Sequence, residues 1–118
     1  MPGDDLADTA FFVARIPDQR VVGTATVRRD PPPWADPEPG AWRLRGMAVA
    51  ADVRGLGIGR QLLDQAISYV KGSGGKVLWA NARTPALGFY LATGFVAVTE
   101  HWVDEVTGPH VGILMELG

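Results

Sequence analysis

The stretch Arg54-Gly-Leu-Gly-Ile-Gly-Arg60 lies between an apolar run, residues 47–49, and an amphipathic run, residues 61–70. In the second run the apolar residues recur at the spacing of one helix face, and the polar residues fall on the opposite face. The order strand, glycine loop, helix is therefore predicted. The apolar face of that helix consists of Leu62, Leu63, Ala66, Ile67 and Val70.

The glycine loop has the chemistry of an anion site. Gly55, Gly57 and Gly59 lack a Cβ atom where the backbone must turn sharply, so main-chain N–H groups can converge on a ligand. Those N–H groups are the unpaired donors of the first helical turn, and the positive end of the helix dipole lies behind them. Arg54 and Arg60 add a positive charge on either side. The predicted guest is a phosphate or a pyrophosphate.

The spacing of the glycines excludes two common kinds of phosphate-binding loop. A dinucleotide fingerprint needs G-x-G-x-x-G, but counting from Gly55 the third glycine comes one residue too early. A Walker loop needs a Lys after its last glycine, whereas Arg60 follows Gly59 here. The pattern Q/R-x-x-G-x-G/A does fit, through Arg54, Gly57 and Gly59.

This pattern resembles the acyl-CoA loop of the GCN5-related N-acetyltransferase (GNAT) superfamily, and Leu44-Arg-Gly-Met-Ala-Val-Ala50 resembles its central strand. A second motif follows in the right order. Leu78-Trp-Ala-Asn-Ala-Arg83 and then Ala86-x-x-Phe-Tyr90-x-x-x-Gly94-Phe95 are similar to the segment in which a strand ends near an Asn and a short helix carries a Tyr. The resemblance covers residues 11–117. The alternative is an ordinary strand-to-helix turn that binds no ligand.

Length and composition limit the class of protein. The 118 residues are predicted to form a single domain over 1–118 with one core, in which residues 1–9 form a loose leader. A formal net charge of -2 argues against nucleic acid as a partner, and the lack of cysteine excludes disulfides and thiolate catalysis. The acidic N-terminus does not resemble a signal peptide, and no apolar run has the length of a membrane span. The protein is predicted to be soluble and cytoplasmic, with no membrane partner.

The segments before the glycine loop are predicted to form strands. Residues 11–16 and 20–27 are typical of an antiparallel hairpin around a turn at Pro17. The five prolines within residues 28–40 exclude a helix or a central strand there, and Trp34 is expected to anchor this loop on the body. A strand over 42–49 then leads into the glycine loop.

The segment after the helix is predicted to return to the sheet. Residues 71–75 form a helix stop, with Gly72 in the left-handed cap position. A strand over 76–81 follows, so that strand, helix and strand make a right-handed parallel crossover.

A short helix and two strands are predicted to complete the chain. Thr84 is expected as the N-cap with Pro85 at the first helical position, and Gly94 closes the helix. Strands over 95–100 and 111–117 are joined by a connection that contains a turn at Gly108-Pro109.

The predicted fold class is α/β (α+β), with a mixed, mostly antiparallel central sheet, one parallel βαβ crossover and flanking helices. The resemblance implies a GNAT-like fold that lacks the usual N-terminal strand and helices, because only residues 1–10 precede Phe11. The acceptor groove is then expected to be open, covered by a second copy of the chain, or completed by a larger protein. A homodimer is favoured, since the hairpin and closing strands would otherwise expose apolar surface.

The resemblance also implies a cofactor site between the two parallel strands, which splay apart at their C-terminal ends. Main-chain groups of Met47 and Val49 would pair with the pantetheine amides of acetyl-CoA, and the glycine loop would hold the diphosphate. An N–H near Val49 would polarise the thioester carbonyl. No metal is expected. The implied cofactor-binding residues are Met47, Ala48, Val49, Arg54, Gly55, Leu56, Gly57, Ile58, Gly59, Arg60, Asn81 and Tyr90.

Tyr90 and Asn81 are the implied catalytic residues. Tyr90 would donate a proton to the departing thiolate, and a phenol of pKa about 10 suits a thiol of pKa about 8.5 only where the site holds it in place. The alternative is that Tyr90 is simply part of the core. Asn81 is expected to hold the cofactor arm or to help position Tyr90.

The general base is left open. Several members of the family place a Glu on the strand before the glycine loop, where this chain reads Trp42-Arg-Leu-Arg45 and has no carboxylate. The remaining candidates are water chains and the side chains of Glu100, His101, Asp104, Glu105 and His110.

The resulting hypothesis is an N-acetyltransferase that passes the acetyl group directly from acetyl-CoA to a primary amine, carried by a small molecule or a peptide. The lack of cysteine agrees with transfer without a covalent enzyme intermediate. Two alternatives stand beside it, a non-catalytic acyl-CoA-binding module and a partner-binding α/β domain.

Overall fold

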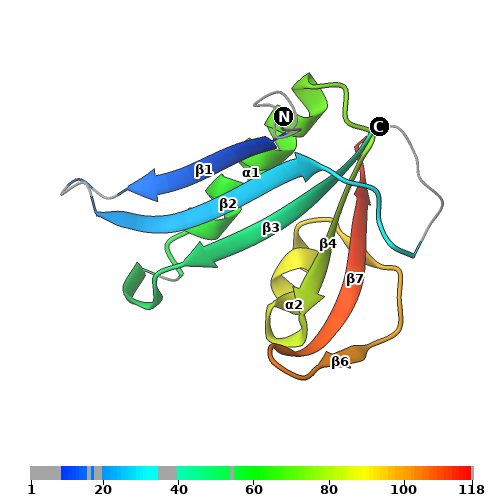
Figure 1. The fold of residues 1–118 in the computed structure, drawn as a ribbon. Coiled ribbons are helices and arrows are strands. Elements are labelled where there is room, and N and C mark those ends of the chain that lie inside the picture. Colours follow the sequence, from blue (N-terminus) through cyan, green and yellow to red (C-terminus); the bar gives the residue numbers. More distant parts are fainter. Residues whose placement is uncertain (1–8, 16, 18–19, 35–39, 54, 118) are drawn as a thin grey trace.

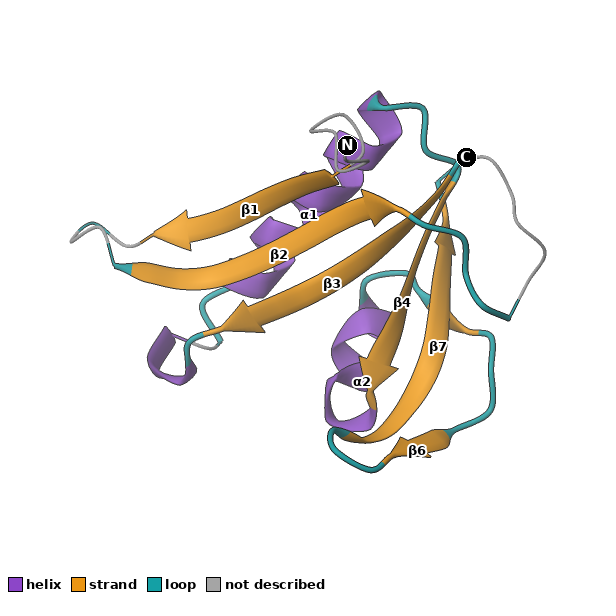
Figure 2. Ribbon diagram, viewed as in Figure 1, coloured by secondary structure: helices purple, strands orange, loops and turns teal. Residues whose placement is uncertain are grey.

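One sheet with two helices behind it makes up the computed structural model, which describes residues 9–15, 17, 20–34, 40–53 and 55–117 (Figure 1; Figure 2). Arg54 and most of the predicted leader lie outside these residues. In chain order the elements are β1 (Thr9–Arg15), β2 (Val21–Arg29), β3 (Ala41–Val49), the 3-10 turn η2 (Ala51–Val53), α1 (Ile58–Gly72), β4 (Val77–Arg83), α2 (Thr84–Ala92), β5 (Val96–Ala97), β6 (Trp102–Asp104) and β7 (Gly108–Glu116).

The sheet has the strand order β1-β2-β3-β4-β7-β5, and β6 pairs with β7. The pair β3 and β4 is parallel, whereas the other pairs are antiparallel. The chain crosses from β3 to β4 through α1. The predicted sheet, mostly antiparallel with one parallel crossover, is therefore confirmed.

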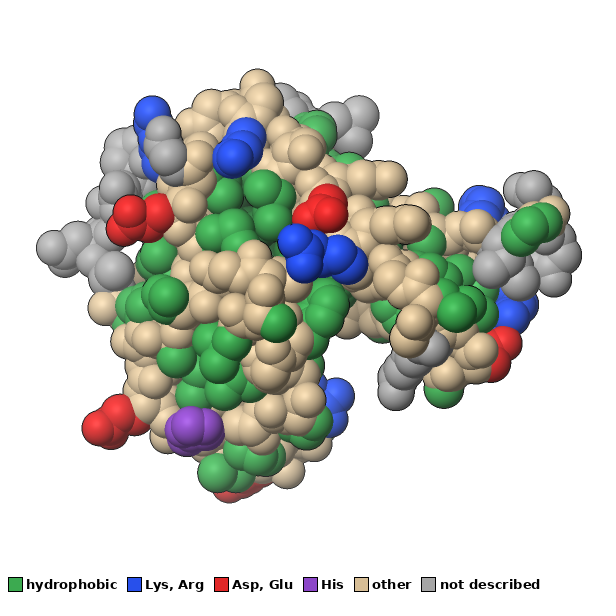
Figure 3. Space-filling model, turned by 180° about the vertical axis from the view of Figure 1, so that it is seen from behind, with side chains coloured by type: hydrophobic (Ala, Val, Ile, Leu, Met, Phe, Trp, Pro, Cys, Tyr) green, Lys and Arg blue, Asp and Glu red, His purple; other side chains and the backbone are tan. Residues whose placement is uncertain are grey.

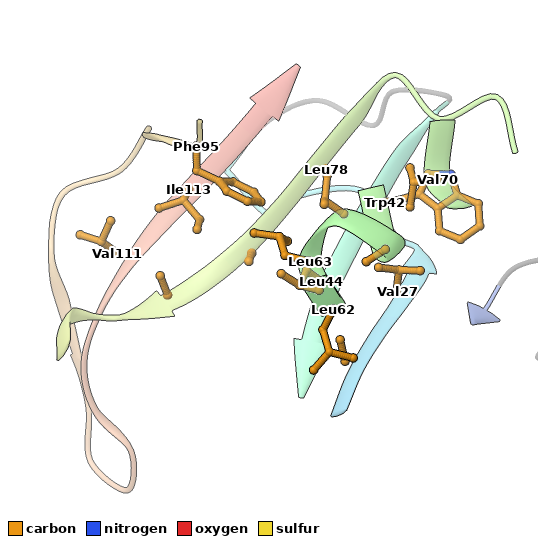
Figure 4. Close-up of a cluster of buried hydrophobic side chains, with 14 residues drawn as sticks. Val27, Trp42, Leu44, Leu62, Leu63, Val70, Leu78, Phe95, Val111 and Ile113 are labelled. Atoms are coloured by element: carbon orange, nitrogen blue, oxygen red, sulfur yellow. The ribbon is translucent and has the colours of Figure 1, made fainter. Parts of the chain in front are cut away.

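The core lies between the sheet and the apolar face of α1 (Figure 4). Leu62, Leu63, Ala66 and Val70 are buried, as the spacing of apolar residues predicted, and Ile67 packs at the edge of the cluster. Leu63 is wholly enclosed. Removing a buried leucine side chain of this kind typically costs about 2–5 kcal/mol of folding free energy, so the packing of this face holds α1 on the sheet.

The end of α1 differs from the prediction. The helix continues through Gly72, and the left-handed residue is Gly74, with φ of 83°. Gly74 N–H donates to the Lys71 carbonyl at 3.0 Å, and Gly75 N–H donates to the Val70 carbonyl at 2.8 Å. These two bonds form a Schellman cap. The prediction was wrong by two residues because the segment contains three glycines, any of which fits a left-handed position.

The start of α2 also differs. Arg83 is the N-cap residue in extended backbone, and no side chain caps the helix, so Thr84 is the first helical residue rather than the cap. Gly94, with φ of 113°, follows the helix as predicted.

The closing strands differ most from the prediction. The strand expected over 95–100 shortens to β5, and an unpredicted strand, β6, forms a hairpin with β7. The Asp104 carboxylate accepts hydrogen bonds from the N–H groups of Val106 and Thr107 at 2.8 and 3.0 Å, and it thereby fixes the turn. Gly108 and Pro109 belong to β7, so the turn precedes the position predicted for it.

Trp34 anchors the proline-rich loop as expected. Its ring meets the Trp79 ring edge-on, with 5.0 Å between centroids. The Trp79 indole Nε1–H donates to the Asp30 carbonyl at 2.6 Å, which ties the start of the same loop to β4.

Candidate functional site

The parallel strands β3 and β4 separate beyond their first three residues. Their last pair is Arg43 with Trp79. Beyond it β3 pairs only with β2, and β4 pairs only with β7. Over residues 44–48 the edge of β3 that faces β4 therefore carries backbone N–H and C=O groups with no strand partner in the described part of the chain, and such groups seek a ligand or water.

A β-bulge lies on β3 within this separated part. Thr24 pairs with Ala48 and Thr26 with Arg45, so β3 has one residue more than β2 between these pairs. Gly46 takes the left-handed conformation there, with φ of 60°, and its carbonyl accepts a hydrogen bond from the Thr24 hydroxyl at 2.9 Å. The bulge reverses the alternation of the strand, and as a result Met47 and Val49 face α1.

The glycine loop behaves largely as predicted. Gly55 and Gly57 have φ of 87° and 82°, and no atom lies within 4 Å of where a Cβ would stand. Gly57 is the N-cap residue of α1, and no side chain caps this helix. The first-turn N–H groups of Ile58, Gly59 and Arg60 have no intrahelical partners by the geometry of an α-helix. They are therefore available to an anion.

Gly59 differs from Gly55 and Gly57, the other two glycines of the loop. It is helical, and a Cβ there would lie 3.5 Å from Val49 Cγ2, 3.6 Å from Met47 Cε and 3.6 Å from Phe89 Cζ. These are ordinary van der Waals distances, so Gly59 lies where α1, β3 and α2 meet and a side chain there has room. The prediction of a sharp turn at Gly59 was wrong.

A cavity of about 770 Å³ lies between these elements. In the space-filling view the molecule is deeply hollowed between the arm formed by β1 to β3 and the body that carries α2 (Figure 3). Most of the predicted cofactor-binding residues line this cavity, namely Met47, Ala48, Val49, Gly55, Gly57, Ile58, Gly59, Arg60 and Tyr90. It is also lined by Val53, Arg83, Pro85, Ala86 and Phe89, which sequence reasoning missed.

Some of the missed lining residues could have been predicted from the sequence, and others could not. Ala86 lies one helical turn before Tyr90, and Phe89 is its neighbour, so both follow from placing Tyr90 on a helix that faces the site. Val53 and Arg83 depend on the 3-10 turn and on the exact end of β4. Neither boundary can be derived from periodicity.

Two predicted ligand residues do not line the cavity. Leu56 is 70% exposed at the tip of the glycine loop. Asn81 pairs with Gly112 of β7, and a Cβ at Gly112 would meet Trp34 on the face away from the helices. Asn81 therefore lies on the opposite face from α2, although its side-chain oxygen is buried and has no hydrogen-bond partner among the described residues. The structure does not bring Asn81 to Tyr90.

Tyr90 lies on α2 between the core and the cavity. Its ring packs edge-on against Phe95 at 5.6 Å and against Phe89 at 5.3 Å between centroids. Burial raises the pKa of the Tyr90 phenol above its ordinary value, so the group stays protonated in neutral solution. It can therefore act as a proton donor but not as a base.

The charges at the cavity are cationic. Among the described lining residues the ionisable side chains are Arg60, Arg83 and Tyr90. Arg60 Nε lies 3.3 Å from the Asp64 carboxylate one helical turn later, in an exposed pair that leaves it free to turn toward an anion. None of the five side chains considered as general base is among the lining residues.

Of those five residues, His110 is paired with a residue that lines the cavity, because it lies opposite Arg83 where β4 pairs with β7. Its ring stacks on Trp102 at 5.6 Å between centroids, and its Nδ1 is 2.8 Å from the Gly108 carbonyl. These contacts hold it on the β6–β7 hairpin.

In the described part of the chain, no cluster of three or more His, Cys, Asp or Glu side chains is arranged to hold a metal ion. Of the helices within the described ranges, none is long and apolar enough to cross a membrane.

Comparisons with known proteins agree with this geometry. The model of the acetyltransferase (GNAT) family matches residues 3–95. Similar solved structures include a GNAT-family acetyltransferase from Staphylococcus aureus Mu50, with 22% identity over 93% of this chain and 68% of that chain and a TM-score of 0.75. Nourseothricin acetyltransferase has 22% identity over 98% and 69%, with a TM-score of 0.78. An aminoglycoside 6'-N-acetyltransferase complexed with coenzyme A has 15% identity over 94% and 74%, with a TM-score of 0.73. These likenesses show the fold, whereas none of the curated proteins compared matches significantly.

Proposed function

Because the chain belongs to the GNAT acetyltransferase family, we propose that it transfers an acetyl group from acetyl-CoA directly to a primary amine. The observation that carries this proposal is the cavity between the separated strands, which joins the bare first turn of α1 to Tyr90. A solved structure of the same fold is a complex with coenzyme A, and this supports the choice of co-substrate.

The cofactor would be held by two parts of the site. The N–H groups of the first turn of α1 and the Arg60 guanidinium would bind the diphosphate. Main-chain groups of β3 beyond its last pair with β4, among them those of Met47, would pair with the pantetheine amides as a neighbouring strand does. An N–H near Val49 would then donate to the thioester carbonyl, a contact whose loss typically costs on the order of 3 kcal/mol. Arg54, outside the described residues, remains a proposed diphosphate ligand.

The transfer would then take place in one addition and one elimination. The neutral amine nitrogen attacks the thioester carbon, the C–S bond breaks, and the thiolate takes the phenolic proton of Tyr90. The amine nitrogen loses its proton to water, and solvent returns a proton to Tyr90. The raised pKa of Tyr90 keeps the donor protonated until the thiolate forms.

Turnover and binding together test this proposal. Tyr90→Phe is expected to lower the rate of thiol release from acetyl-CoA at least about tenfold, while coenzyme A binding by calorimetry stays unchanged. Tyr69→Phe is the matched control, since Tyr69 is the other tyrosine and packs against Phe12 and Trp42 at the edge of the core. Equal turnover of Tyr90→Phe and wild type would contradict the role of Tyr90.

The two alternatives are separated by the same measurements. A non-catalytic module would bind coenzyme A but release no thiol with any amine. A partner-binding domain would bind no coenzyme A, and would lack the gain of about 2.7 kcal/mol in stability that a ligand gives at a hundred times its dissociation constant.

We also propose that the protein forms a homodimer. Phe11 on β1 is 64% exposed and Val13 is 40% exposed, and β1 is the edge strand of the sheet. Apolar side chains on an open edge favour pairing with a second strand. Sedimentation is expected to give twice the chain mass, and a monomer at micromolar concentration would contradict the proposal.

A further inference from the structure

The face of the sheet opposite the helices carries arginines at the point where β3 and β4 separate. Residues that pair across two strands share a face, as do residues two apart on one strand. Thr24 and Thr26 pair with Ala48 and Arg45, so Arg45 lies on the same face as Ala48. Arg43, two residues before Arg45, lies on this face as well.

Two residues of this face line the cavity, Ala48 and Arg83. On β4 the residues Leu78, Ala80 and Ala82 belong to the core beneath the helices, so Trp79, Asn81 and Arg83 alternate to the other face. Ala48 and Arg83 nevertheless line the cavity together with Met47 and Val49, which face α1. The cavity therefore lies at the gap between the strands, where Ala48 and Arg83 of this face belong to its lining.

Three arginines of this face are here called the gap arginines: Arg83, which lines the cavity, and Arg43 and Arg45, which precede the lining residue Ala48 on β3. Arg43 belongs to the last pair before the gap, Arg45 lies two residues further along β3, and Arg83 ends β4 across the gap. Arg45 and Arg83 are exposed, and neither has an ion-pair partner among the described residues.

Arg43 is the most constrained of the three. Its guanidinium lies over the Trp79 ring, 5.0 Å from the centroid, and 3.8 Å from the Asp30 carboxylate. Its Nε is buried and has no hydrogen-bond partner in the described part of the chain. Burial first, and then the charge of Arg45, lower its pKa, so these two guanidinium groups repel each other. An anion beside these two groups would relieve that repulsion.

We propose that the gap arginines select acceptors whose primary amine is carried on a molecule that also bears an anionic group, a carboxylate or a phosphate. This inference rests on the proposed function, because the acceptor must meet the thioester through the gap. Guanidinium groups form short, charge-assisted hydrogen bonds to such anions. They also disfavour a second cationic group on the acceptor.

The gap arginines have a second effect on the acceptor. Nearby positive charge disfavours an ammonium ion and lowers its pKa. The neutral amine that must attack the thioester is thereby populated without a carboxylate or imidazole at the cavity. This fits the lining of the site, in which the described ionisable residues are two arginines and a tyrosine.

Four amines of similar size test the proposal. They are β-alanine, phosphoethanolamine, propylamine and 1,3-diaminopropane, which differ in carrying a carboxylate, a phosphate, no charge or a second cation beside the amine. The expected kcat/KM for one of the two anionic amines is at least about tenfold above that for propylamine, as a charge-assisted contact provides. The ranking of β-alanine and phosphoethanolamine distinguishes the carboxylate from the phosphate.

Variants assign the preference to the gap arginines. Arg45→Gln and Arg83→Gln are each expected to lower the ratio of anionic to neutral amine at least about fivefold, through KM rather than kcat. Lys71→Gln, an exposed cation in the last turn of α1, is the matched control and leaves the ratio unchanged. Preference for propylamine or the diamine, or a ratio unchanged in both arginine variants, would overturn the proposal.

A binding measurement separates this inference from the proposed function. β-Alanine or phosphoethanolamine is titrated calorimetrically into protein saturated with coenzyme A, and heat is expected from wild type but not from Arg45→Gln. Binding without turnover would refute the transferase and leave the anion site standing. Turnover of neutral amines with no binding of either anion would refute the anion site alone.

Discussion

Trp42 and Trp79 lie on opposite faces of the paired part of β3 and β4. Trp42 belongs to the core beneath α1, and Trp79 packs against Trp34 on the other face. Each indole is buried and has one arginine over its ring, Arg29 at 4.7 Å and Arg43 at 5.0 Å from the centroid. They differ in the hydrogen bonding of the indole nitrogen, because Trp79 Nε1 donates to a carbonyl whereas Trp42 Nε1 has no partner among the described residues.

This difference predicts that substitution by phenylalanine reduces the free energy of unfolding by different amounts at the two positions. Trp79→Phe is expected to reduce the free energy of unfolding by about 1 kcal/mol more than Trp42→Phe, because it loses a hydrogen bond while Trp42→Phe removes a buried unpaired donor. Urea denaturation of both variants measures the difference. An equal or larger loss in Trp42→Phe would show that the Trp79 hydrogen bond contributes little.

The glycine loop and the end of α1 supply a matched pair of left-handed glycines. Gly57 and Gly74 have φ of 82° and 83°, and open space surrounds both Cβ positions. Alanine in this conformation costs roughly 1–2 kcal/mol, so Gly57→Ala and Gly74→Ala are expected to lose similar stability. Only Gly57→Ala is expected to weaken coenzyme A binding, by at least about tenfold. Equal affinities in calorimetry would remove Gly57 from the cofactor site.

Gly59 offers a test of the cavity itself. Gly59→Leu would extend a side chain from the first turn of α1 between Met47, Val49 and Phe89, and the cavity has room for it. Coenzyme A affinity is expected to fall at least about tenfold while the protein stays folded. Gly72→Leu, at the other end of α1 with nothing within 4 Å, is the control and keeps wild-type affinity. Unchanged binding in Gly59→Leu would place the ligand elsewhere.

The sequence predicted the elements whose signals are local. The 3.6-residue period of α1 and the glycines at 55 and 57 follow from helix geometry and from left-handed backbone, and both are confirmed. The short strand β6 was not predicted, since three residues carry no readable period. Its place is set by pairing with β7, a contact between distant segments.

The site was predictable only in part for the same reason. Met47 and Tyr90 follow from motifs, but Gly46 inside a strand allows a bulge without requiring one, and the bulge decides which residues of β3 face α1. The arginine side of the gap depends on the register of β4 against β7 and on the exact length of β4. Such features arise from tertiary packing.

The buried phenol of Tyr90 predicts a specific loss of stability in alkali. Its pKa is higher in the folded protein than in the unfolded chain, because burial disfavours the phenolate. Below about pH 10, the ordinary value for tyrosine, both states are protonated and this contribution to stability is complete. As the pH rises further the unfolded chain releases its proton first, so the free energy of unfolding falls until the folded pKa is passed. Tyr90→Phe removes the group, and its stability measured by urea denaturation between pH 8 and pH 11 is therefore expected to fall less steeply than that of wild type. A variant curve parallel to the wild-type curve would mean that the Tyr90 hydroxyl is solvated and titrates as in the unfolded chain, which would contradict its burial between the core and the cavity.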